Sequence, residues 1–185
     1  MLLKHLFKNG RPALRIAPAI IIAVICASAF IACQKEEIRV YRAPREKPSL
    51  ADLTPEHWQQ LAAGQMQQAK FRVTRDNQTI EITLSIFPGD AGGLLANVNR
   101  WRGQIGLNEA DPAALPKLAE AFDAAGPGAK IVDMTGTDAK ATRPARLIGA
   151  IVTRGERTWY YKLLGDPELA EREKPAFLKF AQTAP

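Results

Sequence analysis

The sequence predicts an α+β domain in which an antiparallel sheet has helices packed on one of its faces. Apolar and polar side chains alternate with a period of two in several segments, as in strands with one face in water. Short polar turns join neighbouring segments of this kind, which is typical of β-hairpins. Other segments repeat apolar residues at the spacing of an amphipathic helix. Hairpins and half-wet strands together favour an antiparallel sheet over a parallel one.

The first expected elements are a short helical turn and a β-hairpin. Residues 54–56 have the pattern of an N-cap followed by Pro at the first helical position, and they predict a turn that continues through 58–61. Residues 69–74 and 80–86 alternate apolar and polar side chains. The polar residues 75–78 are the expected hairpin loop between these two strands.

A helix is predicted from Leu94 to Ile105, because apolar side chains recur there at helical spacing. Its apolar face includes Trp101, which is therefore expected in the core. We expect this helix to cover the apolar side of the preceding strand, which consists of Ile80, Ile82, Leu84 and Ile86.

Two aspartates are expected to cap helices in this part of the chain. Asp90 precedes the first helix and is the expected capping oxygen. A second helix is predicted for residues 112–122, with Asp111 as its cap and Pro112 at its first position. A glycine-rich break then leads to a short strand at residues 130–134.

A second hairpin is predicted from residues 147–153 and 157–164, which are β-rich and joined by a short turn. Alternation within the second of these strands places Trp159 and Tyr161 on one face, and Tyr160 and Lys162 on the other. The two faces of this strand are therefore expected to have different environments.

The final helix is predicted to begin after Asp166, with Pro167 at its first position. Pro175 lies inside the helical pattern. Proline in a helix interior removes a backbone hydrogen bond and costs about 3 kcal/mol, so we expect a kink or a restart at this residue.

Residues 1–33 have the order of an export signal. A basic region without acidic residues ends at Arg15, and residues 16–32 are uncharged and mostly apolar. Residues 29–33 resemble a bacterial lipobox, in which a small residue precedes the cysteine that takes the lipid. Cys33 is therefore predicted to be lipidated, which would hold the mature protein at a membrane by more than one acyl chain. An uncleaved signal anchor is the alternative, because the apolar run lies at the lower limit for crossing a bilayer.

The resemblance to lipoproteins also predicts a location. Gln34 follows Cys33, whereas an Asp there would resemble a signal for retention in the inner membrane. The domain is therefore expected outside the cytoplasm, anchored to the outer membrane and facing the periplasm. Its expected partners are the membrane, through the lipid, and a protein of the cell envelope.

The chain is expected to consist of a leader at 1–33, a flexible tether at 34–50 and one globular α+β domain at 51–185. The tether has charges of both signs, two prolines and few large apolar residues. Beyond the leader the chain has 21 basic and 19 acidic residues, so binding to nucleic acid is not expected. Both cysteines lie in the leader, which excludes disulfides and thiolate metal sites within the domain.

The residues of the predicted domain do not form a recognisable catalytic set. His57 is the one histidine after the leader, and it is expected at the surface. Ser85 is a polar-face residue of an alternating strand, and the acidic residues are dispersed without the spacing of a calcium loop. No catalytic residue, metal or cofactor is predicted.

A weak candidate for ligand binding is the turn that precedes the first long helix. Consecutive glycines before a helix leave backbone N–H groups that can hold an anion, and the candidate residues are Gly89, Asp90, Gly92, Gly93 and Arg100. A tight turn with a helix cap is the favoured interpretation, because Asp90 would repel an anion. In addition, Arg100 and Arg102 lie about 200° apart around a helix and cannot face one ligand together.

Residues 157–166, an aromatic-rich strand that ends in a Lys-x-x-Gly turn, resemble the closing motif of the PsbP/Mog1-like superfamily. A helix with a phenylalanine midway, here Phe177, follows this motif. Residues 87–93 and 97–101 resemble a hallmark of uncharacterised bacterial lipoproteins with the same ending. The resemblance covers residues 51–183 and implies an α-β-α sandwich around an antiparallel sheet. Members of this superfamily are mainly assembly factors or binding modules.

These observations favour a lipid-anchored module that acts by binding and not by catalysis. A small envelope enzyme of unrecognised type is the alternative, and a single-pass anchored protein without lipidation is a third interpretation. A deep pocket lined by converging polar groups would favour the enzyme. A shallow aromatic surface would favour the binding module.

Overall fold

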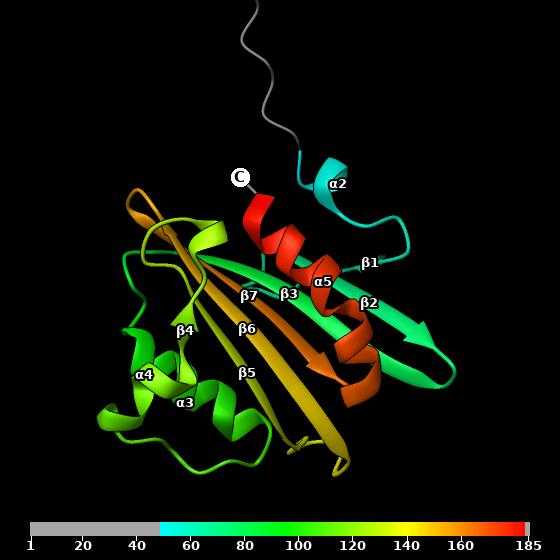
Figure 1. Cartoon of the computed structure of the whole chain (residues 1–185). Helices are drawn as coiled ribbons and strands as arrows, with labels where there is room; N and C mark the ends of the chain where they lie inside the picture. The colour runs from blue at the N-terminus through cyan, green and yellow to red at the C-terminus, as the bar shows by residue number, and fades with distance from the viewer. Residues whose placement is uncertain (1–48, 184–185) are drawn as a thin grey trace, which may run out of the picture. The chain divides into compact units, whose positions relative to one another are not determined.

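Residues 49–183, which the computed structural model describes, form a seven-stranded antiparallel sheet with helices packed against it (Figure 1). The strand order is β1-β2-β3-β7-β6-β5-β4, and each strand is antiparallel to its neighbours. The predicted class, α+β with an antiparallel sheet, is confirmed. The strands are β1 Gln59–Leu61, β2 Ala69–Arg75, β3 Gln78–Pro88, β4 Glu120–Ala121, β5 Lys130–Thr137, β6 Pro144–Arg154 and β7 Arg157–Gly165. The helices are α2 Leu50–Leu53, α3 Leu94–Gln104, α4 Leu115–Leu118 and α5 Pro167–Thr183, with short 3-10 helices η1 Pro112–Ala114 and η2 Asp123–Ala125.

Both predicted hairpins are present, and their turns are tight. Asp76 and Asn77 join β2 to β3, and both adopt positive φ angles, 52° and 64°. Two-residue hairpin turns need this conformation, because it matches the right-handed twist of the strands. Aspartate and asparagine tolerate it better than most residues, which explains why the chain turns at this point.

The larger core lies between the sheet and α5. It contains Ile80, Ile82 and Leu84 of β3, each fully buried, together with Phe177 and Phe180 of α5. The prediction that these β3 residues share one side of the sheet is confirmed. The prediction that the helix at residues 94–105 covers them is wrong. They lie beneath α5, because alternation decides which residues share a face and not which helix covers it.

The second core lies on the opposite face of the sheet, beneath α3. Val98, Trp101 and Ile105 pack there against residues of β5, β6 and β7, which include Leu147 and Tyr160. The expectation that all helices pack on one face is therefore wrong. Strand β7 is central, and it contributes Tyr161 to the first core and Tyr160 to the second.

Trp101 fixes the position of α3 on the sheet. Its ring lies directly over Gly149 of β6, and a Cβ atom at that position would overlap the ring. Trp101 is buried, as predicted, with 6% of its surface exposed. Glycine inside a strand weakens pairing but permits close approach, and here it lets a large aromatic side chain reach the sheet.

The final helix begins where it is predicted, with Pro167 at its first position. The carboxylate of Asp166 accepts hydrogen bonds from the backbone N–H groups of Glu168 and Leu169, at 3.0 and 3.2 Å, and thereby caps α5. The helix continues without interruption through Pro175, so the expected restart is absent. Pro175 is exposed, and buried residues before and after it hold the helix against the sheet.

The N-terminal end of the domain differs from the prediction. The expected helical turn at 58–61 is wrong, since residues 59–61 form β1 and pair with β2. Trp58 is buried, and its indole N–H donates to Glu173 of α5 at 3.0 Å. This contact between Trp58 and Glu173 holds the chain at the edge of the sheet, where residues 59–61 pair with β2. A short helix, α2, lies earlier, and a capping box between Ser49 and Asp52 begins it.

The predicted helix at 112–122 is divided into η1, α4 and the strand β4. Pro112 suits the first position of a helix, but Pro116 lacks the N–H group that would donate to the carbonyl of Pro112 in a continuous helix. The chain therefore forms one 3-10 turn, begins again at Leu115 and ends at Leu118. Asp111 makes no side-chain capping bond.

Among the described residues 49–183, none of the helices has both the length and the apolar character needed to cross a membrane. The predicted leader, with Cys33, lies outside the described residues.

The burial of the apolar face of β3 can be tested by replacing Leu84 with Ala. Leu84 is fully buried, so the loss of its side chain should reduce the free energy of unfolding by about 2–5 kcal/mol. Thr74→Ala on the neighbouring strand is the control, because Thr74 is exposed and its loss should change stability by at most about 0.5 kcal/mol. Chemical denaturation measures both. Equal effects would contradict the assigned core.

Candidate functional site

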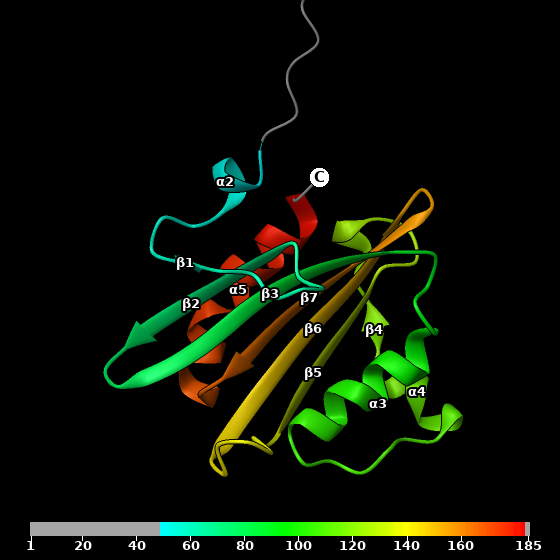
Figure 2. The same cartoon turned by 180° about the vertical axis from the view of Figure 1, so that it is seen from behind.

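The side of the sheet that carries α3 is covered over only part of its width. Helices α3 and α4 lie over the β5 side of the sheet, whereas no helix within residues 49–183 lies in front of β2 and β3 (Figure 2). A trough with a volume of about 650 Å³ occupies the uncovered part. Its floor consists of residues from β2, β3 and β7, and α3 forms one wall. The residues that define its chemistry are Gln67, Lys70, Glu81, Thr83, Arg100, Gln104, Asp138, Lys140 and Lys162.

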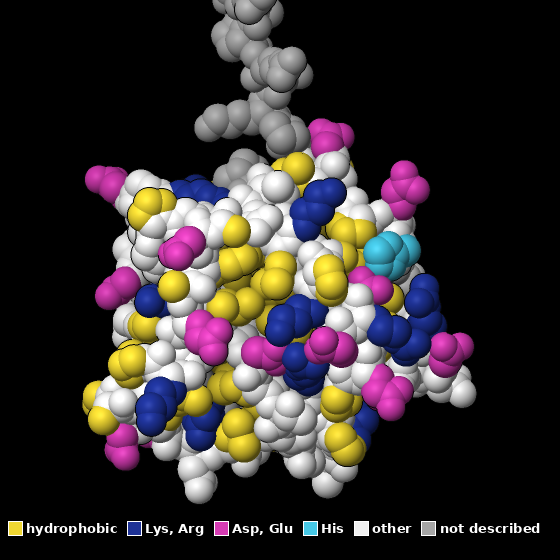
Figure 3. All heavy atoms as spheres, in the orientation of Figure 1, with side chains coloured by type: hydrophobic (Ala, Val, Ile, Leu, Met, Phe, Trp, Pro, Cys, Tyr) yellow, Lys and Arg dark blue, Asp and Glu magenta, His cyan; other side chains and the backbone are white. Residues whose placement is uncertain are grey.

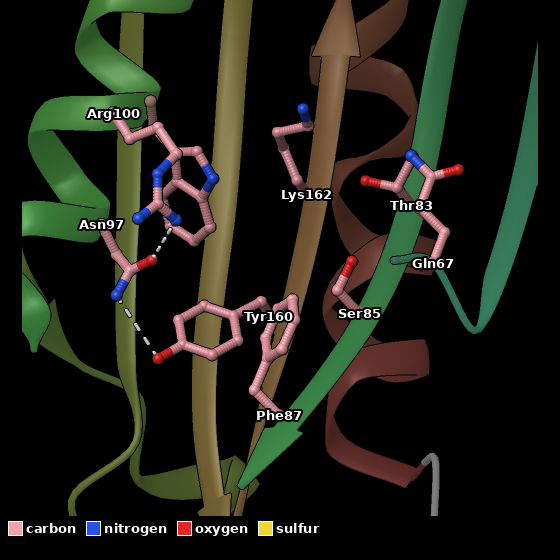
Figure 4. Close-up of a pocket in the computed structure, with 9 residues that line it drawn as sticks. Gln67, Thr83, Ser85, Phe87, Asn97, Arg100, Tyr160 and Lys162 are labelled. Atoms are coloured by element: carbon pink, nitrogen blue, oxygen red, sulfur yellow. Dashed lines mark hydrogen bonds between the residues drawn. The ribbon is translucent and has the colours of Figure 1, made fainter. Parts of the chain in front are cut away.

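A smaller recess of about 150 Å³ adjoins the trough and shares Gln67, Thr83, Arg100 and Lys162 with it. Figure 4 shows how most of these side chains lie, with Thr83 and Ser85 on β3 and Tyr160 and Lys162 on β7. The other residues of the recess are Ser85, Phe87, Asn97, Trp101 and Tyr160.

The floor of the trough follows from strand register. Thr83 of β3 pairs with Lys70 of β2 on one side and with Lys162 of β7 on the other. Lys162 in turn pairs with Gly149 of β6, over which Trp101 lies. Paired residues in neighbouring strands point to the same face of the sheet. One row across the sheet therefore places two lysines, a threonine and the tryptophan of α3 side by side.

Lys162 is the most unusual residue of the trough. It lies in a central strand, is only partly exposed, and its Nζ donates to Gln104 Oε1 at 2.8 Å. Among the residues that the structure describes, no carboxylate lies within ion-pair distance of this ammonium group. Burial lowers the pKa of Lys162. The negative charge of Glu81 opposes this change, and the positive charges of Lys140 and Lys70 add to it.

Glu81 does not supply a free negative charge to the trough. Its carboxylate is bound by Lys70 at 3.0 Å and by Arg72 at 2.7 Å. Burial acts to raise the pKa of Glu81, but the hydrogen bonds and charges of these two cations outweigh it and hold the pKa below its usual value. Glu81 is therefore ionised and already paired with cations.

Arg100 belongs to a hydrogen-bonded chain that links α3 to β7 (Figure 4). Its guanidinium donates to Asn97 Oδ1 at 2.8 Å, and Asn97 Nδ2 donates to the hydroxyl of Tyr160 at 3.4 Å. The Tyr160 hydroxyl donates to the carbonyl of Asp90 at 2.5 Å. Burial, with the nearby charge of Asp90, raises the pKa of Tyr160, so this hydroxyl stays protonated.

The predicted glycine loop does not line the trough, and of its five candidate residues only Arg100 does. Three N–H groups of the loop already have partners within the protein. Gly89 donates to the carbonyl of Glu156 at 2.9 Å, Gly92 to Asp90 Oδ1 at 3.3 Å, and Gly93 to the carbonyl of Asp90 at 3.1 Å. The loop is therefore a closed turn, which agrees with the favoured interpretation.

One detail of that interpretation is wrong. The carboxylate of Asp90 accepts from the turn itself, whereas the N-cap of α3 is Gly93 and makes no side-chain bond. The expected separation of the two arginines is confirmed. Arg102 donates through Nε to the carbonyl of Asn108 at 2.7 Å and does not line the trough.

His57 lies outside the trough. Its side chain is 51% exposed, as expected for a surface histidine, and Nε2 lies 2.8 Å from Glu173 Oε2 of α5. Within residues 49–183, no group of three His, Cys, Asp or Glu side chains could hold a metal ion. On the α5 side of the protein, basic and acidic side chains are interspersed around a group of apolar ones (Figure 3). Asp133 there binds both Arg146 and Lys174.

The sequence analysis placed Lys162 on the same face as Tyr160 but did not select it as a functional residue. A lysine inside a strand with aromatic and aliphatic neighbours was the available signal. The partners that make it unusual, Thr83 and Gln104, are distant in sequence and meet it only through strand pairing and helix packing.

The sequence matches no protein-family model, and a comparison with curated proteins found no similar protein.

Replacing Lys162 with Met should stabilise the protein at pH 7, because the variant no longer buries a charge without a carboxylate partner. The folded-state pKa of Lys162 lies below its ordinary value of 10.5. Between these two pKa values the unfolded chain binds more protons, so the stability of the wild type should rise with pH. Urea denaturation should show the advantage of the variant shrinking toward pH 10. If Lys162→Met is less stable than the wild type at pH 7, the lysine side chain stabilises the folded protein and the prediction is wrong.

Proposed function

We propose that the protein is a membrane-anchored binding module of the cell envelope and that the trough is its ligand site. The observation that carries this proposal is Lys162. A partly buried ammonium group whose one close polar partner in the described structure is the Gln104 amide is costly for folding. Such a group is typical of sites where a ligand completes the set of partners.

The trough also has converging polar groups, which the sequence analysis associated with an enzyme. The state of the two carboxylates in the trough favours a binding site over a catalytic site. Glu81 is paired with two cations, and Asp138 accepts from the N–H groups of Lys140 and Ala141 at 2.8 and 3.0 Å. These hydrogen bonds hold the pKa of Asp138 below its usual value. Neither carboxylate is therefore suited to accept a proton in a reaction near neutral pH.

The proposed location rests on the leader. Its basic region, its apolar run and the residues before Cys33 support a lipid anchor. The predicted tether, residues 34–50, would join this anchor to the domain, except that Ser49 and Leu50 already belong to the start of α2. The layers of the sheet and its helices fit the resemblance to the PsbP/Mog1-like superfamily, which we retain as part of the proposal. Binding and assembly factors predominate in that superfamily.

The binding role can be tested by native mass spectrometry of the full chain in detergent, after exposure to a small-molecule extract of the cell envelope. The wild type should retain a molecule whose mass is unchanged. A Ser85→Trp variant, which places an indole in the recess, should retain much less of it. If the retained molecule has a changed mass, the result would favour the alternative interpretation, in which the protein is an enzyme. Equal retention by both proteins would place the site elsewhere.

The anchor is tested separately by mass spectrometry of the protein extracted from its native membrane. The mature chain should begin at Cys33, and this residue should carry a mass increase that corresponds to a diacylglycerol group and an N-terminal acyl chain. Cys33→Ser should abolish both the processing and the modification, because the thiol is the atom that takes the lipid. An intact Met1, or an unmodified Cys33, would exclude the lipoprotein interpretation.

A further inference from the structure

We infer that the trough selects an organic anion, in which a carboxylate or phosphate group is joined to a ring or another compact apolar part. This inference rests on the proposed function and adds the chemical class of the ligand. The charged group would lie at the end of the site that contains Lys162 and Arg100. The apolar part would enter the recess beside Tyr160 (Figure 4).

The balance of charge in the trough favours an anion. The trough is lined by four cationic and two anionic side chains. Glu81 is neutralised by Lys70 together with Arg72, which lies just outside the trough. Asp138, at the start of the β5–β6 loop, accepts hydrogen bonds from the N–H groups of Lys140 and Ala141 and keeps its negative charge. Four positive and two negative side chains leave the trough with a net formal charge of +2.

The hydrogen bonds of the two central cations leave donors for a ligand. Lys162 has three donors, and one of them is used by the Gln104 amide. Arg100 has five donors, and within residues 49–183 its guanidinium donates to Asn97. Both present partners are neutral amide oxygens. A carboxylate or phosphate oxygen would make stronger, charge-assisted bonds with the same groups.

The recess explains why the anion should be organic. Phe87, Trp101 and Tyr160 meet there edge to face, with ring centroids 5.9 Å apart for Phe87–Tyr160 and 6.4 Å apart for Trp101–Tyr160. Trp101 and Tyr160 are largely buried, and polar side chains line the rest of the recess, so the apolar part of the ligand must be compact. The trough and the recess, with volumes of about 650 and 150 Å³, are together of the size that holds a small organic ligand.

The test is isothermal titration calorimetry of the full chain in detergent with four probes. Phenyl phosphate and benzoate combine a ring with a phosphate or a carboxylate, inorganic phosphate lacks the ring, and benzyl alcohol lacks the charge. We expect one or both of the first two probes to bind saturably, and each of the others to bind about tenfold more weakly or not at all. The comparison of phenyl phosphate with benzoate identifies the preferred anionic group.

Two variants assign the binding to the trough. Lys162→Gln and Arg100→Gln should each lower the affinity for the better anionic probe by about tenfold, because each substitution removes a charge-assisted hydrogen bond to the ligand. Lys179→Gln is the matched control, since Lys179 is an exposed lysine on α5, away from the trough. Affinity should also fall as salt screens the charges. Thermal unfolding confirms that the variants are folded.

Three results would overturn the inference. Benzyl alcohol could bind with the same affinity as phenyl phosphate and benzoate. The affinity for the better anionic probe could be unchanged in both Lys162→Gln and Arg100→Gln. None of the four probes could bind. If a neutral envelope molecule is still retained by the wild type and lost by Ser85→Trp, the proposed binding function stands and only the ligand class is wrong. If no molecule is retained in a trough-dependent way either, both proposals fail.

Discussion

The contact between Trp101 and Gly149 determines the arrangement on one whole side of the protein. Because residue 149 has no side chain, the indole of α3 reaches the surface of β6 and holds the helix over the β5–β6–β7 part of the sheet. The same contact brings Arg100 and Gln104 beside Lys162 of β7. The uncovered surface of β2 and β3 then becomes the floor of a trough. The site therefore depends on a packing contact whose tryptophan also lines the recess.

Much of this fold could be predicted because its strongest signals are local. Period-two alternation identified β2 and β3, β-rich composition around a short turn identified β6 and β7, and helical spacing identified α3 and α5. The predictions failed where distant parts of the chain decide the outcome. Residues 59–61 carry no strand signal of their own, and they become β1 because buried Trp58 is bound to Glu173 more than a hundred residues later. In the same way, no pattern within β3 could indicate that α5, and not α3, would cover Ile82.

The candidate site was harder to predict than the fold, because its parts are individually ordinary. Thr83 and Ser85 are what an alternating strand shows on any wet face, and Arg100 is one of two arginines on the same helix. The sequence drew attention to the glycine loop, yet the N–H groups of Gly89, Gly92 and Gly93 are satisfied within the protein. Lys162 becomes exceptional only when strand pairing places it in the middle of the sheet and α3 limits its access to water.

The two edges of the sheet are formed by very short strands, of three residues in β1 and two in β4. An edge strand exposes unpaired backbone groups, and a long one offers a template to which a second chain can add. β4, however, pairs with only Lys130 and Ile131 of β5, so most of the outer edge of β5 is not covered by a strand. The segment that follows α3 lies against this edge instead, and the carbonyl of Ile105 accepts a hydrogen bond from the N–H group of Thr137 at 2.9 Å. The packing that holds α3 in place therefore also protects β5 from pairing with a second chain.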